Sequence, residues 1–73
     1  MAKIEQVAKI IYDFKERVYN NEFKSMHEID DACYELANKN EFEGRHREWM
    51  LHEAYSAYII HCEVEKIIPV SGY

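Results

Sequence analysis

The apolar residues near the start of the chain alternate at intervals of three and four, and this spacing most constrains the fold. They are Ile4, Val7, Ile11, Phe14 and Val18. Side chains at such intervals line one face of an α-helix. Lysine, arginine and acidic residues occupy most of the remaining positions. The pattern therefore predicts an amphipathic helix over residues 2–19 that must bury one face against other parts of the molecule.

Two further helices are indicated by capping signals. The run Ser25-Met26-His27-Glu28 places serine three residues before glutamate, which is typical of a helix start, and predicts a helix over about 26–38. Asn40 and Glu43 repeat that spacing and predict a third helix over about 41–67, although Gly44 weakens its start. Pro69 restricts the residue before it, so residues 69–73 form a short tail. The third helix would be about 40 Å long.

These patterns predict one all-α domain over residues 1–73, a three-helix antiparallel bundle with a long C-terminal helix. The chain is 48% apolar and 14% aromatic, which excludes a disordered protein. A domain of 73 residues rarely gains more than about 3–5 kcal/mol from its own core. Its two cysteines cannot form a disulfide scaffold. We therefore expect homo-oligomerisation to complete the bundle.

The third predicted helix has apolar residues on two sides. At 100° per residue, one wide face is predicted to pack on the first two helices; it contains Phe42, Trp49, Met50, Ala57, Ile60, Val64, Ile67 and Ile68. A second group lies on the far side: Leu51, Tyr55, Tyr58 and Cys62, with Ile59 near its edge. One subunit has little left to cover this group, which predicts a self-association or partner surface, with a twofold homodimer favoured. The alternative is that the first two helices wrap both sides.

Glu53 falls near the middle of the wide apolar face. A buried carboxylate must be paired, hydrogen-bonded, metal-bound or protonated. It could be a functional acid with a raised pKa, or one half of a structural contact with Lys15, which interrupts the apolar side of the first helix. A rotation of the third helix would instead expose it. His46 lies on the same face, so the predicted buried polar site comprises Glu53, Lys15 and His46.

No motif indicates catalysis, a metal site or a cofactor. Glu43 and His46 have the spacing found in di-metal helical bundles, but the chain holds no second copy of that motif. There is no HExxH or CxxC motif, and the two glycines form no phosphate-binding loop. We therefore expect a protein that is not an enzyme, with no catalytic residues, no metal and no cofactor.

The charge balance limits the partners. With 14 acidic and 9 basic residues, the formal net charge is −5, which disfavours nucleic acid as a direct partner. Arg45 and Arg47 flank His46 and could contact one anion at the start of the third helix, although a solvated helix turn is the commoner explanation. No apolar leader and no membrane-spanning stretch is seen, so we expect a cytoplasmic protein without a membrane partner.

Two functional hypotheses follow. The first is a small acidic protein that self-associates through its third helix and binds or inhibits another protein. Its size and composition are typical of orphan helical proteins of phages and mobile elements, many of which inhibit a host protein. The alternative is an oligomeric protein that binds a small anionic, nucleotide-like ligand at a subunit interface lined by tyrosine, histidine and arginine.

Overall fold

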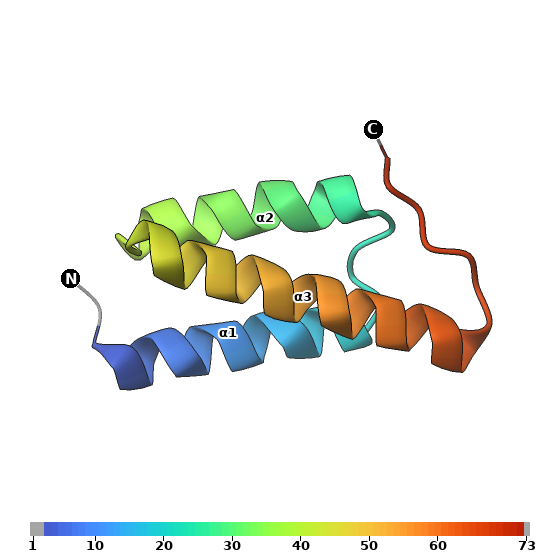
Figure 1. The fold of residues 1–73 in the computed structure, drawn as a ribbon, viewed down its shortest axis with the longest axis horizontal. Helices are drawn as coiled ribbons and strands as arrows, with labels where there is room; N and C mark the ends of the chain where they lie inside the picture. Colours follow the sequence, from blue (N-terminus) through green and yellow to red (C-terminus); the bar gives the residue numbers. More distant parts are fainter. Residues whose placement is uncertain (1–2, 73) are drawn as a thin grey trace.

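The computed structural model describes residues 3–72, which form three helices and no strands. The helices are α1 (Ile4–Tyr19), α2 (Met26–Lys39) and α3 (Gly44–Glu65) (Figure 1). α3 packs against both α1 and α2 and so forms the centre of the molecule. The predicted all-α fold with three helices is confirmed.

The start of α2 is held by two sets of hydrogen bonds. The Ser25 hydroxyl oxygen accepts from the Glu28 backbone N–H at 3.3 Å, as the sequence predicts. The backbone N–H groups of Met26 and His27 donate to the carbonyls of residues 70 and 71, at 2.7 and 2.8 Å. These donors have no partner within the helix itself. The segment after α3 therefore crosses back over the start of α2 and caps it (Figure 1).

Each helix is followed, within two residues of its end, by a residue with positive φ that is not glycine. These residues are Asn21, Glu41 and Lys66, with φ values of 61°, 55° and 58°. After α2, the Phe42 N–H donates to the Ala37 carbonyl at 2.9 Å and the Glu41 N–H to the Asn38 carbonyl at 3.3 Å. This pair of bonds is the Schellman arrangement, which satisfies carbonyls left open at a helix end.

The same closure corrects the predicted bounds of the third helix. Residues 40–42 complete the end of α2, so α3 begins at Gly44 rather than at residue 41. At the other end, the left-handed Lys66 lets the Ile67 N–H donate to the Cys62 carbonyl at 2.9 Å, and α3 ends at Glu65 rather than at residue 67. With 22 residues, α3 is about 33 Å long.

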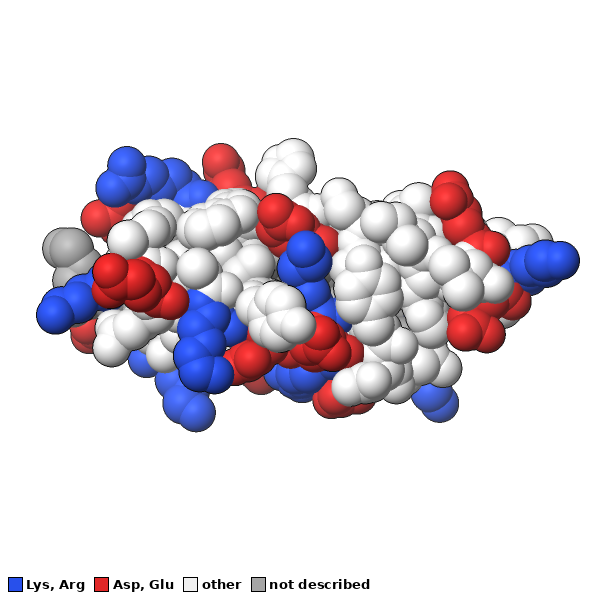
Figure 2. Space-filling view, turned by 90° about the horizontal axis from the view of Figure 1, so that it is seen from below, with Lys and Arg blue, Asp and Glu red and all other residues white. Residues whose placement is uncertain are grey.

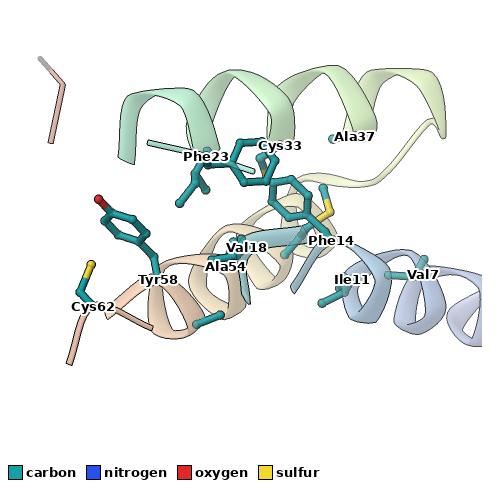
Figure 3. Packing of buried hydrophobic residues seen from close by; sticks show 13 residues of the cluster. Val7, Ile11, Phe14, Val18, Phe23, Cys33, Ala37, Ala54, Tyr58 and Cys62 are labelled. Carbon is teal, nitrogen blue, oxygen red and sulfur yellow. The ribbon is translucent and has the colours of Figure 1, made fainter. Parts of the chain in front are cut away.

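The core forms where α3 meets the other two helices (Figure 3). The predicted stripe of the first helix is buried except at Ile4, which lies exposed in the first turn. Phe23, from the loop after α1, packs edge-on against Phe14 with ring centroids 5.3 Å apart. The buried apolar residues are Val7, Ile11, Phe14, Val18, Phe23, Ile29, Cys33, Ala37, Met50, Ala54, Ala57, Tyr58 and Cys62.

The buried side of α3 differs from the prediction. Tyr58 and Cys62, predicted to lie on an exposed strip, are only 3% and 1% exposed. Ile60 and Val64, predicted to be in the core, are 47% and 72% exposed. Apolar residues lie nearly evenly around α3, so its sequence periodicity does not select one buried face.

Candidate functional site

A groove of about 430 Å³ lies between α2 and α3. This volume is at the lower end of the range of small-molecule sites, about 300–1,000 Å³. α2 and α3 line it with side chains of mixed character: His27, Asp30, Asp31, Cys33, Tyr34, Arg47, Glu48, Leu51 and Tyr55.

The lining residues form two facing rows. On α3, Arg47, Leu51 and Tyr55 are spaced four apart and therefore lie on one side of the helix. On α2, residues 27, 30, 31 and 34 are three or four positions apart and therefore also lie on one side of the helix. Two contacts join the rows, one from Tyr55 to Asp30 and one from Arg47 to Tyr34. Each of these two contacts includes one tyrosine. Along α3, Leu51 lies between Arg47 and Tyr55 and also lines the groove.

Tyr55 and Asp30 make the first of these contacts. The Tyr55 hydroxyl donates a hydrogen bond to Oδ1 of Asp30. Burial raises the pKa of Tyr55 to about 12, with the hydrogen bond to Asp30 and the charge of that carboxylate adding to the effect. Both effects of Asp30 favour the neutral phenol, because ionisation would remove the donor and add a second negative charge.

Cys33 lies buried beneath the groove. Burial raises the pKa of the Cys33 thiol to about 11, the charge of Asp30 adds to this, and the charge of Arg47 opposes it. The thiol donates a weak hydrogen bond to the backbone carbonyl of Arg47 at 3.8 Å. At neutral pH the thiol is protonated, which makes it a packing residue and not a nucleophile.

The two arginines predicted to contact one anion have different neighbours. The Arg47 guanidinium carbon lies 4.7 Å from the centroid of the Tyr34 ring, in cation–π contact. Arg45 Nε lies 2.8 Å from Glu43 Oε2. The two positions are about 200° apart around the helix. The structure therefore does not bring Arg45 and Arg47 together on one ligand.

The predicted contact between Glu53 and Lys15 is present. Lys15 Nζ lies 3.1 Å from Glu53 Oε2, and the two side chains are 33% and 38% exposed. The hydrogen bond from Lys15 and its positive charge hold the pKa of Glu53 below its usual value, and Trp49 adds a smaller hydrogen-bond contribution. The interpretation as an acid with a raised pKa is therefore wrong, and the pair is only partly buried. His46 packs instead against the rings of Phe42 and Trp49.

Only part of the predicted partner surface faces solvent. The Tyr58 hydroxyl donates to the Lys24 carbonyl at 3.5 Å and accepts from the Val70 N–H at 3.1 Å, so its polar end is satisfied inside the molecule. Tyr58 and Cys62 therefore cannot contact a partner in this fold. Leu51 and Tyr55 line the groove and are partly buried, and Ile59 is exposed.

A different exposed apolar surface surrounds the C-terminal half of α3. We call it the apolar end; it comprises Tyr19, Ile59, Ile60, Val64 and Ile67. Tyr19 and Ile67 line one shallow hollow, and Ile59 and Ile60 line another. Figure 1 shows the last turns of α3 extending beyond the end of α1 and the start of α2. Figure 2 shows a broad uncharged area over this part of the molecule, with a belt of charged side chains beside it.

Residues 3–72 contain neither a cluster of metal ligands nor a helix that could span a membrane. No three histidine, cysteine or acidic side chains in this part of the chain converge to hold a metal ion. None of the helices described is both long enough and apolar enough to cross a membrane.

Comparison with known proteins finds no matching family, no matching curated protein and no matching solved structure.

The sequence interpretation missed Asp30, Cys33 and Tyr34 as lining residues of one site. A signal for the groove was present: Asp30 and Tyr34 are four apart on the second helix, and Leu51 and Tyr55 are four apart on the third. The relative rotation of the two helices, which brings these pairs together, is not encoded in either helix alone.

Proposed function

We propose that this protein self-associates through the apolar end and that it acts by binding another protein. In this proposal a second copy of the chain covers the last turns of α3 and thereby completes an antiparallel bundle. A twofold homodimer is the commonest symmetric arrangement. The molecule resembles in size and charge the small acidic proteins that inhibit host proteins in phages and mobile elements, and inhibition of a target is the mode we propose for it.

The observation that carries the proposal is the exposure of large apolar side chains on the projecting part of α3. Val64 is 72% exposed and Ile60 is 47% exposed, and Tyr19 of α1, which is 41% exposed, lines a hollow together with Ile67. Clustered exposed apolar side chains mark association surfaces when they form a continuous patch. Tyrosine suits such surfaces because its ring is buried in the contact while its hydroxyl finds a polar partner.

The test is the mass of the protein in solution, measured by sedimentation equilibrium over a range of concentrations. We expect the wild type to exceed the mass of one chain and Val64→Lys to shift it toward one chain. Val64 is exposed, so this change does not disturb the core. A matched control is Ile4→Lys, which makes the same kind of change at an exposed residue at the other end of the molecule.

The proposal fails if the wild type has the mass of one chain up to high micromolar concentration. It also fails if Ile4→Lys lowers the mass as much as Val64→Lys, because the effect would then not depend on the apolar end. Circular dichroism of both variants should show unchanged helicity, since neither residue is buried.

A further inference from the structure

We propose that the groove between α2 and α3 binds an organic cation, an ammonium or guanidinium group carried on a short apolar or aromatic body. The groove adjoins the apolar end, because Tyr55 lines both the groove and the hollow formed by Ile59 and Ile60, but neither proposal depends on the other. The groove is a formed cavity, and its charge and its aromatic lining both match such a ligand.

The charges around the groove favour a cation. Three carboxylates line it, from Asp30, Asp31 and Glu48. The facing cationic groups are Arg47 and, when protonated, His27, which lies 3.5 Å from Asp31. The carboxylates therefore outnumber the cations, and this balance favours a cation over an anion as the ligand of the groove.

Asp30 is positioned to receive the charged group. Its Oδ1 accepts the hydroxyl hydrogen of Tyr55, which fixes the carboxylate at the edge of the groove. An ionised carboxylate has about four lone-pair sites on its two oxygens, so one hydrogen bond leaves room for a second donor. Hydrogen bonds between a cation and a carboxylate are about twice as strong as those between neutral groups.

The lining also suits the body of such a ligand. Tyr34, Tyr55 and Leu51 supply ring faces and an aliphatic surface. A cation near an aromatic face is attracted to the ring, and the structure already contains one example, the Arg47 guanidinium over Tyr34 at 4.7 Å. Arg47 therefore occupies one end of the groove as a resident cation, and an incoming cation is expected at the end formed by Asp30 and Tyr55.

The experiment uses three probes of matched shape and different charge. The full chain is titrated with tyramine, with the neutral 4-hydroxyphenethyl alcohol and with the anionic 4-hydroxyphenylacetate, to about 10 mM each, while backbone amide shifts are followed by NMR. We expect saturable shifts at groove residues with tyramine, at least about fivefold weaker binding of the alcohol and no binding of the anion. Equal or tighter binding of the anion or the alcohol, or no saturable binding of any cation, would overturn the proposal.

A second cation separates two sources of the same chemistry. The probe N-acetyl-arginine methylamide carries a guanidinium on a peptide backbone, as a partner protein would present it. Binding of this probe more tightly than tyramine assigns the groove to an arginine side chain of a protein, whereas the reverse order assigns it to a free amine. Failure of both overturns the proposal without affecting the mass measurement on the apolar end.

Charge-neutralising variants locate the site. Glu48→Gln and Asp30→Asn should each weaken tyramine binding by at least about threefold at low salt, and added salt should reduce that difference. The matched control is Asp13→Asn, which removes one carboxylate from exposed α1 and should leave binding unchanged. Arg47→Gln should instead tighten binding, because it removes the resident cation. The proposal is wrong if Asp13→Asn weakens binding as much as Asp30→Asn, or if Arg47→Gln abolishes binding while the helices remain intact.

Discussion

α3 packs on two partners, and the two seams are built differently. The seam with α1 contains mostly large side chains from that helix: Val7, Ile11, Phe14 and Val18. The seam with α2 buries Ile29 together with two smaller residues, Cys33 and Ala37. Each seam also contains a hydrogen bond between two polar side chains of different helices. Lys15 reaches Glu53 across the first, and Tyr55 reaches Asp30 across the second.

The two seams differ in the size of their buried side chains, and we connect this difference to stability in one seam and to binding in the other. Large apolar residues fill the α1 seam, where removal of a side chain leaves a cavity. Along the α2 seam the buried row is narrow, and polar and aromatic residues border it to form the groove. We infer that the α1 seam supplies more of the folding free energy, while the α2 seam provides the more specific surface.

The largest effect that tests this comparison is expected at Phe14, which is 1% exposed. Phe14→Ala should lower the free energy of unfolding by about 3–5 kcal/mol, because it removes a buried ring and leaves a cavity. Cys33→Ala, in the α2 seam, should cost only about 1 kcal/mol. Urea unfolding followed by circular dichroism measures both changes.

The control for Phe14 is Tyr12→Ala, an aromatic truncation in the same helix at a residue that is 63% exposed. It should change stability by no more than about 0.5 kcal/mol. If Phe14→Ala does not fold, Phe14→Leu keeps most of the apolar volume and gives a measurable value. A larger loss at Cys33 than at Phe14 would reverse our assignment of the two seams.

The second prediction concerns alkaline pH and the α2 seam. The pKa of Cys33 rises from 9.0 to about 11 and that of Tyr55 from 10.0 to about 12 on folding. When the pKa of a group is higher in the folded protein, the unfolded chain loses that proton at lower pH. The group's contribution to stability is therefore fully present below its unfolded pKa and is lost as pH rises through its folded pKa. The free energy of unfolding should therefore fall between about pH 9 and pH 12, by an amount on the order of 2 kcal/mol for Cys33.

Two variants separate the contributions to this alkaline loss. Cys33→Ala should reduce the slope of stability against pH between about 9 and 11, and Tyr55→Phe should reduce it at higher pH. Urea unfolding across this range measures both slopes. If the slope of stability against pH were identical in the wild type and in both variants, the pKa values of Cys33 and Tyr55 would not be raised by folding.

The local features of the fold could be predicted, because each depends on one segment. The buried residues of the first helix form a single apolar stripe in the sequence. Ser25 is a recognisable N-cap of the second helix. The left-handed Glu41 could not be predicted, because that conformation is uncommon outside glycine and asparagine. Its consequence was the wrong start for the third helix.

The candidate sites divide in the same way. The contact between Lys15 and Glu53 was one of three alternatives that the sequence left open for Glu53, and it was raised because each residue interrupts a predicted apolar face. The rotation of α3 could not, since its apolar residues surround the helix and packing on α1 and α2 together decides which side is buried. Tyr58 was therefore assigned to an interface although it belongs to the core.

The smallest predicted effect concerns the polar contact of the α1 seam. Glu53→Gln should lower the free energy of unfolding by about 0.2–1 kcal/mol near neutral pH, because the ion pair with Lys15 is partly exposed and screened by water. The folded pKa of Glu53 is lowered, so its contribution is present above the unfolded pKa of 4.5 and is lost as pH falls through the folded pKa. Urea unfolding at about pH 7 and about pH 3 should therefore show a difference between wild type and variant that shrinks in acid.

The control is Asp13→Asn, which breaks the more exposed pair with Lys9 and should cost no more than about 0.5 kcal/mol. A Glu53→Gln cost that is equally large in acid would mean that the side chain stabilises the α1 seam by packing and not by charge, and the two seams would then differ in polar contacts as well as in side-chain size.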